Sequence, residues 1–336
     1  MPTEGCDVII VGGGPAGLAC ARELADSELS VLILDKASVL GNKPCGGGIC
    51  EKEVAVPYEA RWSKKTATQI IRAGQRTVTI NRRYKRITFE REDLASYQER
   101  LLQDAKNITV LKNVLVTEIL PGSIKTTQGL YQYKYLVGAD GSASIVRAYL
   151  KLPNKLALGM YYRIRGTFDA VVAYYDPRKM GPGYIWEFPH PTYTNIGIYF
   201  EPCFLDARQA KAILQEYLRK RNYTFFEKDF LTAPINYNYM GHQFGDIYLI
   251  GDAGGFACRM HGGGINNAII SGTEIAKRIK DAGYTAKPLR DMIRSKQSSD
   301  KLIEYFAVVP VWLAQGVIVM IMHLYRVPFF QKLLPI

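Results

Sequence analysis

Residues Cys6–Gly17 read CDVIIVGGGPAG and join an apolar run to a glycine-rich turn. The run over residues 6–11 is rich in β-branched side chains, which is typical of a strand buried on both faces of a parallel sheet. Gly12 permits a tight turn, Gly14 lets the backbone approach a pyrophosphate, and Gly17 allows a helix to pack closely on the strand. The stretch therefore predicts a βαβ unit that binds a dinucleotide.

A second apolar strand, Ser30–Asp35, follows the predicted helix and reads SVLILD. It ends on a carboxylate about 20 residues after the glycines, where Asp35 can accept hydrogen bonds from an adenosine ribose. The helix N-terminus adds amide N–H groups and a positive dipole that attract phosphate. The cofactor contacts predicted for this unit are Gly12, Gly14, Pro15, Ala16, Gly17, Asp35 and Lys36.

Two later turns distinguish FAD from NAD as the cofactor. Residues 137–147 read VGADGSASIVR, and residues 250–254 read IGDAG before three glycines at 262–264. Together with the first turn, they resemble the flavin monooxygenase and reductase superfamily with the p-hydroxybenzoate hydroxylase-like fold. In that superfamily the Gly-Asp aspartate binds the ribityl chain, and the following helix N-terminus faces the flavin. The resemblance implies FAD, with contacts from Asp140, Gly251, Asp252, Gly263, Gly264, Ile265 and a helix-start arginine, Arg91.

Residues 157–200 carry a different pattern of repeated aromatic-rich strands, such as MYYRIRGTF and YIWEF. They predict an antiparallel sheet inserted into the nucleotide-binding domain, because a strand of the buried parallel type returns at Ile247–Ile250. Residues 77–89 also alternate, which favours an antiparallel pair. The expected fold class is α/β, with a discontinuous FAD-binding Rossmann-like domain (1–155 and 240–285), an inserted antiparallel-sheet substrate domain (156–239) and an apolar helical C-terminus (286–336).

Two more motifs narrow the family. Residues 42–49 read NKPCGGGI, and residues 183–189 read GYIWEFP, with Asn195-Ile196-Gly197 shortly after. They closely resemble the geranylgeranyl reductase family, whose members carry KPCGG after the second strand and Y-x-W-x-F-P in the substrate sheet. The resemblance covers about residues 5–285. It implies reduction of isolated C=C bonds in a polyprenyl chain carried on a diphosphate, a glycerolipid or chlorophyll.

Cys45 is the candidate catalytic residue, because a thiol in this glycine-rich loop can supply a proton opposite the flavin hydride. The alternative is that Cys45 is only a small residue in a flexible loop and has no chemical role. Tyr184, Trp186 and Phe188 alternate along one strand and share a face, where they can wall an apolar tunnel or simply pack against a helix. Cys45 and Gly46 are also expected near FAD. The expected substrate residues are Tyr184, Trp186, Phe188, Gly47 and His261.

The loop after Gly251-Asp252 departs from the family pattern of a proline followed by Thr-Gly-Glu-Gly. Arg259 stands at the proline position, His261 at the threonine and Gly263 at the glutamate. Arg259 and His261 add hydrogen-bond donors close to the expected pyrimidine edge of the flavin, where they can shift its potential or bind an anion. These departures leave the usual substrate, and the reductase activity itself, open.

The chain has 336 residues, 48% of them hydrophobic and 22% charged, and a formal net charge of +12. The charge favours an acidic partner, such as a phosphorylated substrate or an anionic membrane face. Nucleic acid is not expected, because no zinc spacing or RNA-binding signature accompanies the charge. No metal site is expected either, since the six cysteines include no CxxC pair and the four histidines are scattered. The N-terminus lacks a basic region before its apolar run, which predicts a cytoplasmic protein without a signal peptide.

The segment from Tyr305 to Ile336 is strongly apolar. Its central run, 311–325, is about 15 residues long and shorter than the roughly 20 that a membrane-spanning helix needs. We expect a helix that either packs into the core or lies in a membrane interface as a peripheral contact. In the second case the residues near the headgroups are Trp312, Tyr325, Arg326 and Lys332.

Three functions stay open on the sequence alone. The first is an FAD-dependent reductase that saturates C=C bonds of a polyprenyl diphosphate or prenyl lipid at the membrane surface, with NADPH or a reduced ferredoxin as the electron donor. The second is a flavin-dependent monooxygenase, epoxidase or halogenase, in which oxygen meets the reduced flavin. The third is a non-catalytic flavoprotein that relays electrons or binds lipid. An aromatic substrate sheet is unnecessary for relay, which favours the two enzymes.

Overall fold

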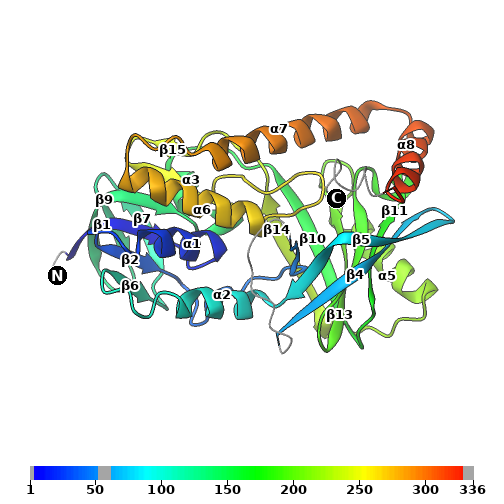
Figure 1. The fold of residues 1–336 in the computed structure, drawn as a ribbon, viewed down its shortest axis with the longest axis horizontal. Helices are drawn as coiled ribbons and strands as arrows, with labels where there is room; N and C mark the ends of the chain where they lie inside the picture. Colours follow the sequence, from blue (N-terminus) through cyan, green and yellow to red (C-terminus); the bar gives the residue numbers. More distant parts are fainter. Residues whose placement is uncertain (1–3, 52–61, 328–336) are drawn as a thin grey trace.

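The computed structural model describes residues 4–51 and 62–327, which form two sheets side by side (Figure 1). The first sheet has the strand order β15-β16-β9-β1-β2-β6, and the hairpin of β7 and β8 joins it at β9. Its central pairs, from β16 across to β6, are parallel. The strands are β1 (Glu4–Val11), β2 (Val31–Leu34), β6 (Ile108–Leu111), β7 (Val116–Leu120), β8 (Ser123–Thr126), β9 (Leu130–Gly138), β15 (Gln243–Phe244) and β16 (Ile247–Leu249).

Strand β1 is buried on both faces, as its apolar run predicts. Val8 and Ile10 pack under α1 (Pro15–Leu24) and α6 (Ile265–Lys280), whereas Ile9 and Val11 pack on the other face with β7 and α3 (Ile145–Tyr149). Helices α1 and α6 lie against each other, which brings the N-termini of both helices to the same edge of the sheet (Figure 1). The remaining elements of this half are α2 (Arg91–Arg100) and the short helix η1 (Gly141–Ala143).

The second sheet has the order β14-β10-β13-β12-β11-β4-β5-β3 and is antiparallel except where β11 pairs with β4. Its elements are β3 (Gly48–Cys50), β4 (Ser63–Ala73), β5 (Arg76–Phe89), β10 (Leu156–Arg165), β11 (Ala170–Tyr175), β12 (Tyr184–Pro189), β13 (Tyr193–Phe200) and β14 (Phe230–Asn236), with α4 (Pro177–Met180), α5 (Ala207–Lys220) and η2 (Glu227–Asp229). The sequence boundaries differ from this arrangement, because β3, β4 and β5 fall inside the 1–155 segment assigned to nucleotide binding. The pairing that joins them to the second sheet links β4 to β11, about 100 residues further on, and leaves no local signal.

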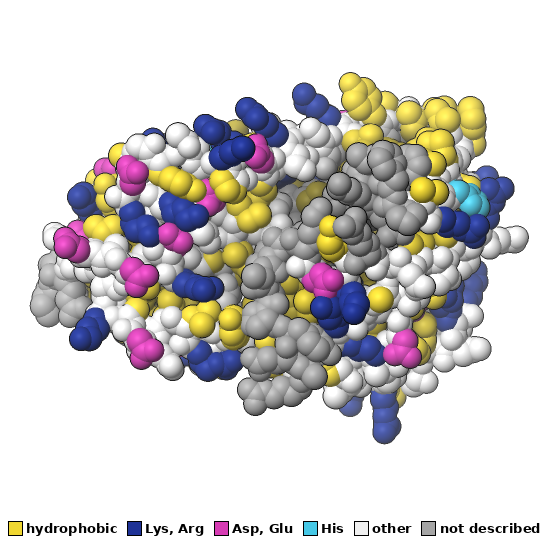
Figure 2. Space-filling view, in the orientation of Figure 1, with side chains coloured by type: hydrophobic (Ala, Val, Ile, Leu, Met, Phe, Trp, Pro, Cys, Tyr) yellow, Lys and Arg dark blue, Asp and Glu magenta, His cyan; other side chains and the backbone are white. Residues whose placement is uncertain are grey.

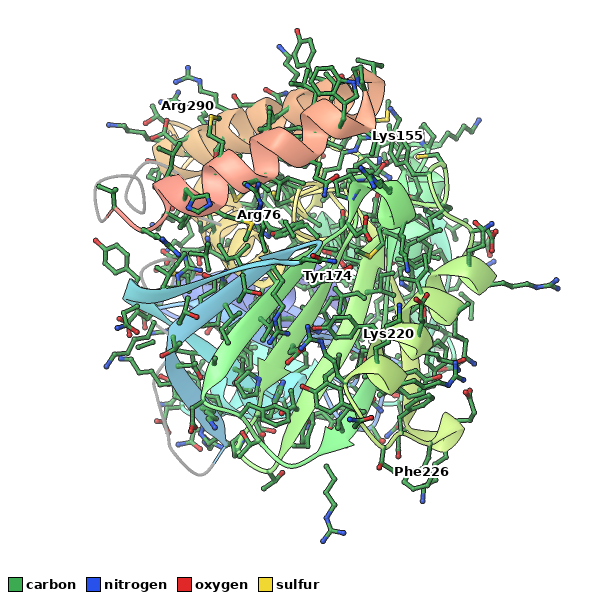
Figure 3. All side chains as sticks on the ribbon, turned by 90° about the vertical axis from the view of Figure 1, so that its right-hand side faces the viewer. Arg76, Lys155, Tyr174, Lys220, Phe226 and Arg290 are labelled. Atoms are coloured by element: carbon green, nitrogen blue, oxygen red, sulfur yellow. The ribbon has the colours of Figure 1, made fainter. Side chains whose placement is uncertain are left out.

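The α/β fold class with two sheets is confirmed, and two helices complete it. Helix α7 (Lys287–Val308) runs from the first sheet to the second, and α8 (Val311–Leu324) turns back over the β4–β5 hairpin (Figure 1). Figure 3 shows α8 above this hairpin, with Arg76 labelled at its turn. Hydrophobic side chains gather on the surface where α7 ends and α8 begins (Figure 2). Within residues 4–51 and 62–327, no helix is both long and apolar enough to span a bilayer.

The inner face of α8 packs on the hairpin through Met322, and Tyr325 just beyond the helix joins the same cluster. Tyr325 is only 1% exposed, so its predicted place at a membrane headgroup is wrong. The Tyr325 ring is buried against β4 and β5 because Tyr325 follows Met322 by about one helical turn and lies on the same side. Trp312 and Arg326 are exposed as that prediction requires, and Lys332 lies outside the described residues.

Candidate functional site

The glycine-rich turn has no room for side chains. Gly12 has a φ of 108°, and a Cβ on it would lie 2.5 Å from the Ala139 carbonyl oxygen. A Cβ on Gly17 would lie 2.0 Å from the Gly12 carbonyl oxygen, so α1 rests directly on the turn. Gly14 caps α1, and the nearest atom that its Cβ would meet is Nη2 of Arg91, at 3.9 Å. The start of α1 is therefore open toward a guanidinium, as a diphosphate site requires.

Asp35 lies beside this turn and supports it. Its carboxylate accepts hydrogen bonds from the backbone N–H of Gly13 at 2.7 Å and of Ala37 at 2.8 Å. A carboxylate has about four lone-pair sites, so these two bonds leave capacity for a ribose hydroxyl. The neighbouring side chain of Lys36 is exposed.

Two buried polar atoms near the turn lack a partner in the described part of the chain. They are Nε of Arg91 and Oδ1 of Asp140. The other oxygen of Asp140 accepts from the Ile145 backbone N–H at 2.6 Å, and burial raises the pKa of this carboxyl group. Buried polar groups normally have hydrogen-bond partners, so the orphaned atoms fit a polar cofactor lying across the turn. The residues present thus fit FAD, whose nucleotide half would be held by α1, Arg91 and Asp35.

Asp252 lies at the start of α6 and carries a concentrated set of contacts. The Lys43 ammonium is 2.7 Å from Oδ2, and the Ser142 hydroxyl donates to the same oxygen at 3.1 Å. Burial alone would raise the pKa of Asp252, but Lys43, Arg91 and Ser142 together hold it below its ordinary value. The ionised carboxylate sits next to Gly264, the N-cap of α6, whose Cβ would lie 3.1 Å from Oδ1. An acceptor here suits the hydroxyls of a ribityl chain.

The loop that carries Cys45 is fastened to the second sheet. Its backbone N–H donates to the Tyr161 hydroxyl at 3.2 Å, and its carbonyl accepts from the Asn195 amide at 3.1 Å. His190 bonds the Gly46 carbonyl through Nε2 at 3.1 Å. The Cys45 thiol is half-buried and accepts from the Gly47 N–H at 3.4 Å. Burial raises the pKa of Tyr161 to about 12, so its hydroxyl stays neutral as a fixed support for this loop.

Glycines let this loop lie directly on aromatic rings. A Cβ on Gly46 would lie 3.3 Å from the Phe188 ring, and one on Gly48 would lie 3.0 Å from it. Trp186 covers Gly197 of the next strand, whose Cβ would be 2.3 Å from the indole. The indole Nε1–H donates at 2.9 Å to Asn195, the residue that also holds Cys45. One asparagine thus links the thiol loop to the aromatic strand.

Tyr184, Trp186 and Phe188 lie on one face of β12, as their alternation predicts. Successive ring centroids are 6.3 Å and 6.1 Å apart. The second glycine-rich loop covers the other end of this row, because Tyr184 donates to the carbonyl of His261 at 2.8 Å. The His261 side chain is exposed, and its Nδ1 accepts from the Gly263 N–H at 3.1 Å.

Arg259 differs from expectation. Its guanidinium donates to Glu201 through Nε at 2.8 Å and Nη2 at 2.9 Å, and its third nitrogen lies 3.6 Å from Glu304 of α7. Glu201 is 3% exposed and needs a buried cation. The donors expected at the flavin edge are therefore committed to an ion pair that joins the loop to α7.

The structure brings the predicted residues together in two neighbouring groups. The nucleotide group holds the first turn, Asp35 and Arg91, and the loop group holds Cys45 and the aromatic row beside Asp252. Sequence reasoning missed five residues that position these groups, namely Lys43 as the partner of Asp252, Ser142, Tyr161, His190 and Asn195. Asn195 begins the quoted Asn-Ile-Gly motif, to which no role was given, and His190 directly follows YIWEFP.

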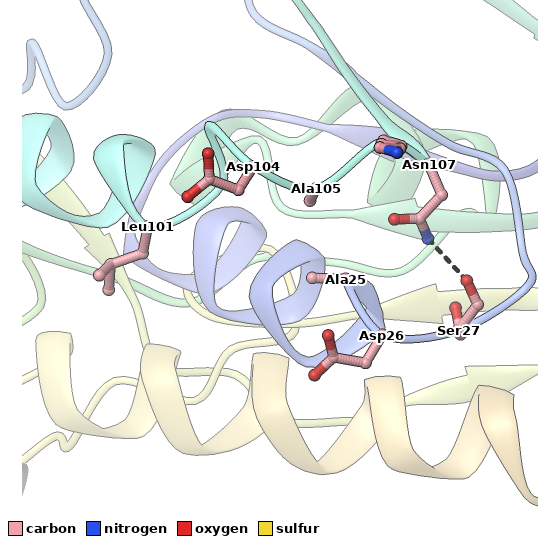
Figure 4. Close-up of a pocket in the computed structure, with 8 residues that line it drawn as sticks. Ala25, Asp26, Ser27, Leu101, Asp104, Ala105 and Asn107 are labelled. Atoms are coloured by element: carbon pink, nitrogen blue, oxygen red, sulfur yellow. Dashed lines mark hydrogen bonds between the residues drawn. The ribbon is translucent and has the colours of Figure 1, made fainter.

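A hollow of about 420 Å³ lies elsewhere, at the C-terminal end of α1 (Figure 4). In its lining, the Asn107 amide is hydrogen-bonded to the carbonyls of Leu24, Ser27 and Leu29. The glycine-rich turn is at the opposite end of this ten-residue helix, about 15 Å away. The hollow is thus separate from the site described above. In the described residues, no group of three or more His, Cys, Asp or Glu side chains is placed to bind a metal.

Comparison with known proteins agrees with this geometry. The family model of the pyridine nucleotide-disulphide oxidoreductases matches residues 6–166. An uncharacterised protein of Methanosarcina barkeri is 29% identical over 82% of this chain and 75% of its own length. Digeranylgeranylglycerophospholipid reductase 3 of Methanosphaera stadtmanae is 27% identical over 87% of this chain and 82% of its own length. This chain is a relative of the geranylgeranyl reductases.

Two solved structures have folds similar to that of this chain. A geranylgeranyl bacteriochlorophyll reductase-like protein of Thermoplasma acidophilum superposes with a TM-score of 0.80 at 20% identity, covering 97% of this chain and 92% of its own. The flavin-dependent brominase Bmp2 superposes with a TM-score of 0.69 at 16% identity, covering 96% and 93%. The predictions of an FAD-dependent oxidoreductase and of its fold are confirmed. The roles of individual site residues stay predictions.

Proposed function

We propose that this oxidoreductase saturates C=C bonds of a geranylgeranyl or longer polyprenyl chain, carried on a diphosphate or a lipid. The observation that carries the proposal is the junction at Asn195, which joins the Cys45 loop to Trp186 of the aromatic row. A thiol and a row of apolar rings are thereby held together next to Asp252 and the start of α6. An alkene has no polar group for recognition, so apolar rings and exclusion of water are what its binding requires.

Each part of the site has a role in this reaction. Bound FAD, once reduced, supplies the hydride that forms a C–H bond at one alkene carbon. Cys45, or a water molecule beside it, supplies the proton to the other carbon, so one C=C bond becomes a single bond with two added hydrogens. Tyr161 and Asn195 keep the thiol in place, and Tyr184, Trp186 and Phe188 line the path of the prenyl chain. Asp252 and Lys43 position the ribityl part of the cofactor.

The electron donor is NADPH or a reduced ferredoxin. We propose a cytoplasmic protein that works as a peripheral enzyme at a membrane surface, because its substrate class is lipid-like and its net charge is +12. The relatives named for geranylgeranyl lipids support this substrate class.

An anaerobic single-turnover experiment tests the proposal. The flavin-loaded protein is reduced with dithionite and mixed with geranylgeranyl diphosphate or a digeranylgeranyl phospholipid, and the products are identified by mass spectrometry. We expect a gain of two hydrogens for each double bond, together with flavin reoxidation. Cys45→Ser should retain FAD and lose most of the turnover, whereas Cys203→Ser, at an exposed cysteine, should leave it unchanged. Equal turnover in Cys45→Ser would remove that thiol from the mechanism.

A second candidate is a flavin-dependent monooxygenase, epoxidase or halogenase. The fold shared with the brominase supports it, as does His261 in place of the family's threonine. This candidate predicts no mass gain under anaerobic conditions and substrate-linked oxygen consumption in air. A protein that only relays electrons would show neither result.

A further inference from the structure

The end of α7 and the start of α8 form an apolar corner, here called the α7–α8 corner. It consists of exposed hydrophobic side chains, namely Leu302, Tyr305, Val308, Val311, Trp312 and Leu313. Val308 is 80% exposed, Trp312 71% and Tyr305 69%. Figure 2 shows this corner as the hydrophobic cluster at the upper right, projecting from the body of the molecule. Single exposed apolar residues are common on proteins, but a projecting cluster with two aromatic rings marks a contact surface.

Basic side chains lie along α8, the helix that leads away from this corner. Arg76 is exposed on the β4–β5 turn, which meets α8 where a Cβ on Gly74 would lie 3.4 Å from the Gln315 amide. Arg178 of α4 is exposed beside α8, and Arg326 is exposed at its end. The exposed acid on this stretch of α7, Glu304, faces Arg259 at 3.6 Å. An apolar tip followed by a helix flanked by exposed arginines matches the interface of an anionic bilayer, where rings enter the headgroup layer and cations meet phosphates.

The inner side of α8 connects this corner to the aromatic row. Tyr175 packs in the cluster under α8 and its ring is 5.6 Å from that of Tyr184. Tyr184 in turn contacts Trp186, which covers the Cys45 loop. Apolar contacts thus continue from the base of α8 to the candidate thiol.

We infer that the α7–α8 corner docks on an anionic lipid bilayer, with Trp312, Tyr305 and Val308 in the interface. This inference rests on the proposed function for the direction of substrate transfer, but the docking itself requires only the surface described here. The corner is the lipid-binding surface.

Tryptophan fluorescence tests the docking directly. The chain has three tryptophans, of which Trp62 and Trp186 are 9% and 6% exposed, so the solvent-sensitive signal belongs to Trp312. The flavin-loaded protein is mixed with vesicles of phosphatidylglycerol or of phosphatidylcholine, both free of prenyl lipid and reductant. We expect co-flotation with the anionic vesicles, a blue shift of emission and quenching by brominated lipid. Because neither substrate nor turnover is present, a failed reductase assay leaves this result intact, and the reverse also holds.

Matched variants identify the surface. Trp312→Ser combined with Val308→Ser should weaken vesicle binding at least about tenfold, or about 1.4 kcal/mol, because two apolar side chains would no longer enter the interface. Phe226→Ser is the control, because Phe226 is 59% exposed at the opposite end of the second sheet (Figure 3). Arg76→Gln should weaken binding to phosphatidylglycerol alone. Unchanged flotation in the double variant, or no flotation of the wild type, would overturn the inference. So would a concentration-dependent dimer, in sedimentation without lipid, that the double variant abolishes.

Discussion

Removing the Arg259 guanidinium should destabilise the protein measurably. The Glu201 carboxylate is 3% exposed and takes two hydrogen bonds from Arg259 and one from the Tyr237 hydroxyl, at 2.8 Å. Arg259→Met keeps much of the side-chain volume but leaves this carboxylate with its tyrosine partner and no cation. Breaking a buried ion pair by removing one member typically costs about 3–5 kcal/mol.

The expected shift in melting temperature follows from the size of the chain. Unfolding entropy is about 2.1 cal/mol/K per residue, or roughly 0.7 kcal/mol/K for 336 residues, so Tm should fall by about 4–7 °C. Differential scanning calorimetry of the flavin-loaded protein measures this shift. Arg290→Met is the control, because Arg290 is exposed on α7 (Figure 3).

A second variant separates the ion pair from simple loss of packing. Adding Glu201→Gln to Arg259→Met removes the unpaired charge, so the double variant should be more stable than Arg259→Met alone. If Arg259→Met melts with the wild type and the double variant melts lower, the carboxylate does not depend on this arginine, and the reasoning fails.

Three further predictions concern the glycine-rich turn at Gly12–Gly17 and the loop that carries Cys45. Gly17→Ala should yield protein with little FAD, measured as the ratio of flavin to protein absorbance, because its Cβ would lie 2.0 Å from the Gly12 carbonyl oxygen. Gly5→Ala is the control, because Gly5 has open space around it. Asn195→Ala should loosen the Cys45 loop and speed alkylation of Cys45 by iodoacetamide, with Cys203 as the internal reference. An unchanged rate ratio would mean that Tyr161 and His190 hold the loop without Asn195. Burial lowers the pKa of His190, so its contribution to stability is complete above its ordinary value of about 6.5 and is lost as pH falls below that value. His190→Asn should therefore flatten the decline of Tm between about pH 6.5 and 5, and an identical slope in the variant would assign the decline to another group.

The parts of the site that sequence predicts are those whose signal is local. The turn at Gly12–Gly17 and the acid at Asp35 lie within one βαβ unit, so spacing alone places them together. The alternation of Tyr184, Trp186 and Phe188 likewise gives their common face without further information. The ion pair of Lys43 and Asp252 joins residues 209 positions apart, and no periodicity reports it.

Tyr325 and Arg259 were predicted wrongly because their contacts are distant in the sequence. Tyr325 looks like an interfacial ring in an apolar tail, yet its burial depends on the β4–β5 hairpin, more than 200 residues earlier. Arg259 looks like a donor to the flavin because the motif puts it there, but its nitrogens face Glu201, directly after β13, and Glu304 on α7. For both residues, a strand or helix that is distant in the sequence determines the contacts of the side chain.

Because α7 is one continuous helix, the direction of α8 depends on the number of residues in α7. Lys296 anchors the helix midway, with its ammonium bonded to the Tyr237 carbonyl at 2.7 Å and to Asp300 at 2.6 Å. Each residue of an α-helix adds about 100° of rotation and 1.5 Å of rise. Inserting one residue after this anchor would turn α8 about a quarter of a circle off the β4–β5 hairpin, whereas inserting seven would nearly restore its direction but carry it about 10 Å outward. The number of residues between Lys296 and Pro310 therefore sets both the direction and the position of α8.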